Sequence, residues 1–259
     1  ASLSMSCNGT KANAGNTDTD STSVEETATV YYIRDITPAN LVKIYEALGR
    51  KPEGKTGIKI STGESSKSNQ LDTALIADLV RAIGGNFIEC NTAYAGNRNT
   101  TEKHYRTAKA HGYVDLAGVD IMDGEGEVEI PVKGGTHLTK DIVGKNFLDY
   151  DFIAVLSHFK GHQMGGFGGA LKNISIGIAS SNGKAYIHSA GKTQNADSIW
   201  SNVAEQDAFL ESMAEACKGV IDHIGKNKML YINVANNLSI DCDCNGNPAA
   251  PEMKDLGIL

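Results

Sequence analysis

Long apolar runs, an excess of basic residues and a large set of cysteines are all missing from this sequence of 259 residues. No stretch of eighteen apolar residues occurs, so the sequence predicts no membrane-spanning helix. The 24 lysines and arginines are outnumbered by 31 acidic residues, which gives a net charge of −7. Because proteins that hold a polyanion need a cationic surface, this balance argues against nucleic acid and anionic membranes as partners.

Cysteines are few and unevenly spaced, which excludes a disulfide framework in a chain of this size. The five are Cys7, Cys90, Cys217, Cys242 and Cys244. Cys217 falls on the apolar face of a predicted helix, where a cysteine acts as a small buried hydrophobe. The Cys242-Asp243-Cys244 pair could bind a soft metal or oxidise. We expect no iron–sulfur cluster, because a four-iron cluster needs four convergent thiolates.

Residues 1–28 differ in composition from the rest of the chain. Small residues precede Cys7, and a tract rich in Asn, Thr, Ser, Asp and Glu follows it up to about Thr27. This pattern is typical of a bacterial lipoprotein, in which the cysteine takes lipid and the polar tract is a disordered tether. We therefore expect a protein of the cell envelope or periplasm with a lipid anchor at Cys7; the alternative is an ordinary disordered tail.

From residue 29 to 259, short apolar runs alternate with segments of helical period. This alternation predicts an α/β domain with a largely parallel, doubly wound sheet flanked by helices. The expected strands are Val30–Arg34, Gly57–Thr62, Asn86–Asn91, Val119–Met122, Asp151–His158 and Met229–Val234. The expected helices are Pro38–Leu48, Leu71–Ile83, Thr101–His111 and Val203–Ile224. Glu125–Val132 alternates with period two and predicts a small edge hairpin.

A glycine-rich segment follows the most apolar of these strands. Its glycines, Gly165, Gly166, Gly168 and Gly169, would let backbone N–H groups approach a ligand, and Lys172 adds a full charge. We interpret the segment as a site for a small anion such as a phosphate or carboxylate. The glycine spacing matches neither a Walker loop nor a dinucleotide fingerprint. The alternative is a flexible loop that binds nothing.

Three histidines lie in or just beyond the same region. His158 and His162 are four residues apart and His188 follows, so the three could ligate one metal ion if the fold brings them together. Ligands of open α/β sheets bind beyond the carboxyl ends of the strands, where we expect these histidines and Lys172 to converge. Structural histidines are the alternative interpretation.

The residues from Leu156 to Asn173, together with Gly183-Lys184 and His188, resemble the hallmark of the family called domain of unknown function 362. Many members are named iron–sulfur centre proteins because a ferredoxin-like insert follows the residue that corresponds to His188. Here Ser189–Asn202 takes that place and contains no cysteine, so the resemblance does not imply a cluster. The family pattern continues past Leu259, and we expect the chain to be truncated at its C-terminus.

The spacing of His162, Lys172 and His188 is similar to that of nickel-pincer lactate racemases, in which a lysine holds the cofactor near metal-binding and acid–base histidines. Asn97-Arg98 stands where that family has a His-Arg pair. The resemblance implies His162, Lys172 and His188 as catalytic residues. It also implies proton or hydride abstraction next to a carboxylate, with an unidentified metal ion as electrophile. The expected ligand-binding residues are Gly165, Gly166, Gly168, Gly169, Lys172, Asn173 and Arg98. The alternative is a non-catalytic periplasmic binding or interaction protein.

Overall fold

Residues 28–259 are described by the structure, a computed structural model. The predicted tether and its lipid-bearing Cys7 fall in residues 1–27, outside the described part of the chain. None of the helices within residues 28–259 is both long and apolar enough to cross a membrane.

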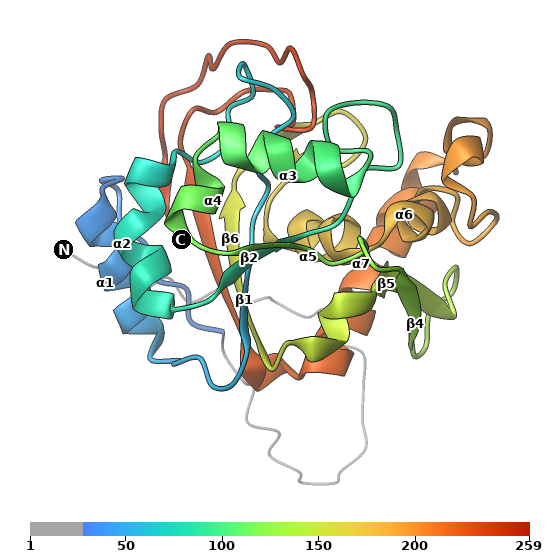
Figure 1. Ribbon diagram of the computed structural model, residues 1–259, viewed down its shortest axis with the longest axis horizontal. Helices are drawn as coiled ribbons and strands as arrows, with labels where there is room; N and C mark the ends of the chain where they lie inside the picture. The colour runs from blue at the N-terminus through green and yellow to red at the C-terminus, as the bar shows by residue number, and fades with distance from the viewer. Residues whose placement is uncertain (1–27) are drawn as a thin grey trace, which may run out of the picture.

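A six-stranded sheet forms the centre of the molecule (Figure 1). Its strands, in spatial order, are β10 (Gly257–Ile258), β9 (Met229–Ala235), β6 (Phe152–His158), β1 (Thr56–Lys59), β2 (Asn86–Glu89) and β3 (Val119–Ile121). All neighbours pair in parallel except β10, which is antiparallel to β9. Read from β3 to β9 and numbered one to five by their order in the chain, the parallel strands have the spatial order 3-2-1-4-5. The chain therefore adds strands on one side of β1 first and on its other side afterwards, so the strand order reverses between β1 and β6. The predicted doubly wound α/β fold is confirmed.

Strand β6 shows why this sheet needs helices on both faces. All seven of its residues are buried. Phe152, Ala154 and Leu156 belong to one hydrophobic cluster, whereas Ile153 and Val155 belong to another on the opposite face. A strand buried on both faces reads as a continuous apolar run, which made this segment recognisable in the sequence.

Helices cover the two faces of the sheet separately (Figure 1). The α-helices are α1 (Pro38–Leu48), α2 (Thr73–Ile83), α3 (Thr101–Ala110), α4 (Tyr113–Leu116), α5 (Ala170–Ile178), α6 (Ser181–His188) and α7 (Gln206–Ile224). The 3₁₀ helices are η1 (Lys145–Asp149), η2 (Ala196–Ser201) and η3 (Lys226–Lys228). The apolar sides of α1 and α2 pack on one face, and those of α5 and α7 pack on the other. Helix α2 starts two residues later than predicted because Asp72 is its N-cap and accepts a hydrogen bond from the Ala74 N–H.

Two segments differ from their predictions. Val30–Arg34 is not a strand: Ile33 alone forms a bridge, to Ile258, while Val30 and the two tyrosines after it are exposed. The period-two segment becomes β4 (Glu127–Pro131), which pairs with β5 (Lys140–Gly144) in a separate two-stranded sheet rather than at an edge of the main one. A second hairpin, β7 (Lys160–His162) with β8 (Gly166–Gly168), was not expected.

Candidate functional site

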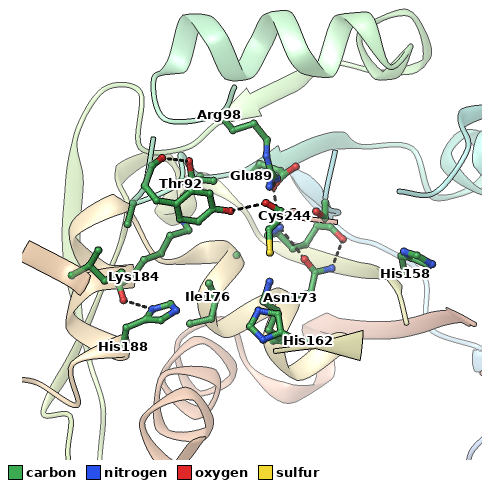
Figure 2. Close-up of a pocket in the computed structure, with 18 of the residues that line it drawn as sticks. Glu89, Thr92, Arg98, His158, His162, Asn173, Ile176, Lys184, His188 and Cys244 are labelled. Carbon is green, nitrogen blue, oxygen red and sulfur yellow. Dashed lines mark hydrogen bonds and ion pairs between the residues drawn. The ribbon is translucent and has the colours of Figure 1, made fainter. Parts of the chain in front are cut away.

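A cavity of about 90 Å³ lies at the carboxyl ends of β1, β2 and β6, where the strand order reverses. Helices α5 and α6 and the segment around Cys244 complete its wall (Figure 2). Open α/β sheets bind their ligands at this position because the loops on either side of the reversal separate there. The fold therefore puts the cavity where a ligand is expected.

Most residues predicted from the sequence as site residues border this cavity. They are His158, His162, Gly169, Lys172, Asn173, His188 and Arg98. Gly165, Gly166 and Gly168 do not: they form the turn and second strand of the β7–β8 hairpin. The Gly165 N–H donates to the His162 ring, so the glycines do not form the predicted concavity of N–H groups. The catalytic and ligand-binding roles of all these residues stay predictions.

Positive charge dominates the cavity wall. Lys59, Lys160, Lys172, Lys184 and Arg98 border it, against a single carboxylate, that of Glu89. Three of the cations have acidic partners. Arg98 Nε lies 2.9 Å from Glu64, Lys160 Nζ 2.8 Å from Asp243, and Lys59 Nζ 3.8 Å from Glu89.

Two cations in the wall lack such a partner. Within residues 28–259, neither Lys172 nor Lys184 has a carboxylate oxygen within 4 Å. The Lys184 ammonium donates instead to the Ala179 carbonyl, at 2.5 Å. This surplus of charge in a buried space favours an anion.

Burial affects these lysines unequally. It lowers the pKa of Lys59 to about 8, although Glu89 opposes the shift. It also lowers the pKa of Lys184. Burial would lower the pKa of Lys172 too, but the neighbouring Cys242 thiolate raises it above its ordinary value. Lys172 therefore keeps its charge, while Lys59 loses its proton at a lower pH than an ordinary lysine does.

His188 is arranged to accept a proton. It ends α6, and its Nδ1–H donates to the Lys184 carbonyl at 2.7 Å. This bond leaves the lone pair on Nε2. Burial lowers the pKa of His188 to about 4, so the ring is neutral at physiological pH and its Nε2 lone pair carries no proton.

His158 differs from its predicted role as a metal ligand. Its Nδ1 lies 2.9 Å from an Asp243 carboxylate oxygen and its Nε2 lies 2.6 Å from the Asn236 carbonyl. Both partners are acceptors, so both ring nitrogens donate and neither has a lone pair for a metal. Figure 2 shows His158 well separated from His188. In this arrangement His158 anchors the chain between the two cysteines.

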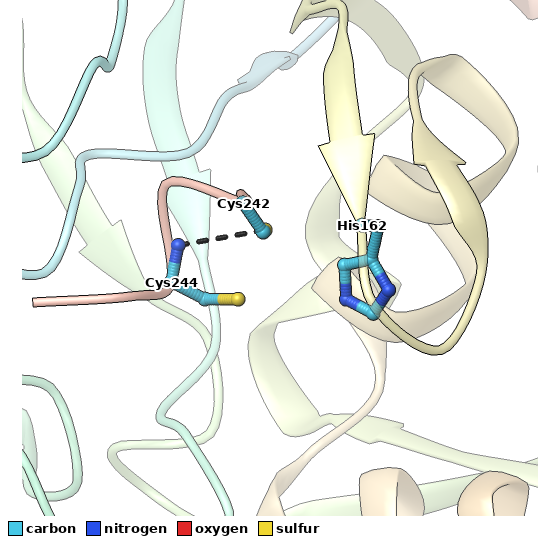
Figure 3. A group of neighbouring side chains, drawn as sticks. All are labelled: His162, Cys242 and Cys244. Atoms are coloured by element: carbon cyan, nitrogen blue, oxygen red, sulfur yellow. Dashed lines mark hydrogen bonds between the residues drawn. The ribbon is translucent and has the colours of Figure 1, made fainter. Parts of the chain in front are cut away.

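The third histidine, His162, meets the Cys242-Asp243-Cys244 segment instead. One ring nitrogen of His162 and the two sulfur atoms all lie within 4.8 Å of one another (Figure 3). These are the donor types that a soft metal ion prefers, so the three residues could hold one. The sequence placed both cysteines past the last parallel strand, but nothing in it joined them to a histidine eighty residues earlier.

The two thiols differ in acidity. The hydrogen bond with Cys244 lowers the pKa of Cys242 well below its ordinary value, and the Lys172 ammonium, 3.4 Å from Cys242 Sγ, adds to this effect. The same pair interaction raises the pKa of Cys244. Burial lowers the pKa of His162 to about 4. Cys242 is thus the thiolate, and an uncharged imidazole faces it.

Sequence analysis missed four charged residues of the wall, Lys59, Glu89, Lys160 and Lys184. For Lys59 and Glu89 the sequence did contain a signal, because each is a charged residue inside an otherwise apolar strand. Lys184 gave none beyond its place beside Gly183 in the family hallmark.

Together, fold and site define a class: a doubly wound α/β protein with a cationic cavity and a cysteine pair at its switch point. The chain belongs to the family described as domain of unknown function 362 (DUF362), whose model matches residues 56–259. A comparison with curated proteins gives no match.

Two solved structures are similar to this chain at low sequence identity. One is the lactate racemase apoprotein from Thermoanaerobacterium thermosaccharolyticum, with 14% identity and a TM-score of 0.46 over 81% of this chain and 54% of that one. The other is a protein from Thermotoga maritima, with 13% identity and a TM-score of 0.44 over 86% of this chain and 52% of that one. The chain thus spans about half the length of each.

Proposed function

We propose that the protein is an enzyme that binds a small carboxylate in the cationic cavity and removes a proton from the carbon next to it. One observation carries the proposal. Two lysines that have no carboxylate partner within residues 28–259, Lys172 and Lys184, border the same cavity as a neutral histidine, His188, whose Nε2 lone pair is free to act.

The roles follow from charge and hydrogen bonding. Lys172 holds the carboxylate, because its half-buried ammonium keeps its charge and is paired with the Cys242 sulfur rather than with a carboxylate. Arg98 is already held by Glu64 and Glu89, so it adds positive potential rather than a free hydrogen-bonding edge. His188 Nε2 accepts the proton, and the Lys184 carbonyl stabilises the imidazolium that forms by holding its Nδ1–H.

Solvent exchange at the reacting carbon tests the proposal. The protein is incubated in D₂O with pyruvate, malonate or another small carboxylate that has an acidic C–H, and loss of the ¹H signal is followed by NMR. We expect exchange with the wild type and none with His188→Gln, which cannot take up the proton. Binding without exchange would instead favour a non-catalytic binding protein.

Binding is measured separately by calorimetry with the same carboxylates. Lys172→Met should weaken binding by about tenfold or more, since a charge-assisted hydrogen bond to a buried anion is worth roughly 1.5–3 kcal/mol. Lys103→Met removes an exposed lysine of α3 and should leave the affinity unchanged. Equal affinities for wild type and Lys172→Met would contradict the role of Lys172.

We also propose that the protein is exported to the cell envelope and anchored through a lipid on Cys7. The composition of residues 1–28 supports this. Mass spectrometry of the protein from its native host should find a lipid on Cys7, and an unmodified Cys7 on the mature protein would refute the anchor.

A further inference from the structure

We propose that His162, Cys242 and Cys244 bind one thiophilic metal ion of the zinc class, with a fourth coordination position open to the cationic cavity. The effect of the ion on carboxylate binding rests on the proposed function. Its binding rests on the three donors alone.

The donors are suited to such an ion in type and spacing. Two sulfurs and one imidazole nitrogen form a Cys₂His set, which in catalytic zinc sites leaves a fourth position for water or substrate. Tetrahedral bonds of that kind separate the donors by roughly 3.3–3.8 Å. The three donor atoms lie within 4.8 Å of one another, so small side-chain rotations bring them to bonding distance.

The residue between the cysteines holds the loop in place. Asp243 is 1% exposed, and its carboxylate accepts a hydrogen bond from His158 Nδ1 at 2.9 Å and forms an ion pair with Lys160 at 2.8 Å. Both partners come from the end of β6 and the start of β7. Because Asp243 is fixed on one side, the sulfurs of Cys242 and Cys244 lie on the side that faces His162 (Figure 3). A braced pair of thiols loses little further freedom when it takes up an ion.

The hairpin that carries His162 can adapt to the ion. The Gly165 N–H donates to His162 Nδ1 at 2.9 Å, which leaves the ring proton on Nε2. Figure 3 shows the ring facing the cysteines across a short gap. An ion on Nε2 moves that proton to Nδ1 and breaks the bond to Gly165. The next residue, Gly166, has a φ of +72°, and two glycines at the turn let the backbone rearrange with little strain.

The ion would also change what Lys172 can do. Lys172 now contacts the Cys242 sulfur at 3.4 Å, which neutralises part of its charge. A divalent ion with two thiolates is neutral, so the sulfur no longer balances the ammonium. The lysine is then available to a carboxylate, and the metal-loaded protein should bind the carboxylate more tightly than the metal-free protein.

Metal binding is measured on the whole, reduced chain with Zn²⁺ and with Co²⁺ as a spectroscopic probe. We expect one ion per chain by elemental analysis after dialysis, and a thiolate-to-cobalt charge-transfer band. Cys242→Ser and Cys244→Ser should each abolish the band. Cys217→Ser is the matched control and should retain it, because Cys217 lies on the buried apolar side of α7, in a hydrophobic cluster. An unchanged band in both site variants, or no ion on the wild type, would overturn the proposal.

A second measurement uses only the wild type, so it does not depend on how the variants fold. In ¹⁵N-labelled protein the Gly165 amide signal should shift on addition of Zn²⁺, and an unshifted signal would overturn the assignment of His162. Carboxylate affinity is then compared with and without a chelator. Metal binding without carboxylate binding would refute the proposed function alone, whereas carboxylate binding without metal binding would refute this site alone.

Discussion

Lys59 contributes to the site although a charged lysine is an unfavourable residue for a buried strand. It is 1% exposed at the end of the central strand, where its ammonium donates to Asn173 Oδ1 at 3.0 Å and lies 3.8 Å from Glu89. A buried charge persists only when it is paired and hydrogen-bonded, and these partners meet that need. Gly177 on α5 makes room for it, since a Cβ there would be 2.6 Å from the Lys59 Cε.

Asp141 is a second buried ionisable group, and its carboxyl is only partly hydrogen-bonded. It is fully buried, its Oδ1 accepts the Ile142 N–H, and its Oδ2 has no hydrogen-bond partner. Burial raises the pKa of Asp141 to about 7. Between the ordinary pKa near 3.8 and pH 7, the folded chain holds a proton that the unfolded chain has lost. The free energy of unfolding therefore falls as pH rises through this window and levels off above it.

Asp141→Asn removes this dependence. Relative to wild type, the variant should gain free energy of unfolding as pH rises from 5 to 8, because its side chain cannot ionise. Urea denaturation at several pH values measures the difference. Asp78→Asn, at an exposed position of α2, is the control and should show no comparable trend. A constant difference between Asp141→Asn and wild type would contradict the shifted pKa.

At the scale of elements, α6 carries two residues of the site and depends on one close contact. Gly183 packs against β5 so tightly that a Cβ would lie 1.9 Å from the Ile142 carbonyl oxygen. That oxygen belongs to backbone and cannot rotate away. The contact sets how near Lys184 and His188 come to the cavity.

Gly183→Ala should therefore displace α6 and lower the free energy of unfolding by about 1–3 kcal/mol, despite the better helix propensity of alanine. Gly177→Ala is the matched comparison, because its Cβ would meet side-chain atoms of Lys59 and Asn173 rather than backbone. We expect a smaller stability loss there, measured by thermal unfolding. Equal losses in the two variants would show that the α6–β5 contact is not special.

The same elements show what sequence could predict. Strands such as β6 and helices such as α2 were found because apolar residues recur with a clear period and capping residues mark their ends. Helix α6, Ser181–His188, has a weakly amphipathic and polar sequence, so tertiary packing rather than local pattern makes it a helix. Hairpin β7–β8 was hidden because its glycines favour a loop interpretation.

Prediction of the site was limited in another way. The sequence put His162, His188 and Lys172 at the same end of the sheet, and they do border one cavity. It could not foresee that Asn236 and Asp243 occupy both nitrogens of His158. Such contacts depend on long-range packing, which leaves no local pattern.

At the scale of the whole molecule, the edge of the sheet joins distant parts of the chain. Ile258 is fully buried, pairs with Val234 of β9 and bridges to Ile33. Its side chain belongs to the hydrophobic cluster shared by α1, α2 and the sheet. One residue thus connects the first described segment, the last parallel strand and the core.

Ile258→Ala should lower the free energy of unfolding by about 2–5 kcal/mol, the range for truncating a buried isoleucine. Guanidinium denaturation gives the value. Leu256→Ala is the control: this side chain is 56% exposed, and its loss should change stability little. A loss below about 1 kcal/mol for Ile258→Ala would mean that this edge unfolds separately from the core.

The strand order has a consequence for synthesis on the ribosome. The central strand β1 pairs with β6, which begins about a hundred residues later, and β6 in turn pairs with β9, which is made later still. Until β9 emerges, the nascent chain presents one edge of β6, its most apolar strand, with unpaired backbone groups that invite aggregation. Cys242 and Cys244 follow β9, so the lysines of the cavity are made well before the thiols that face them. The site can therefore close only after Cys244 has emerged from the ribosome.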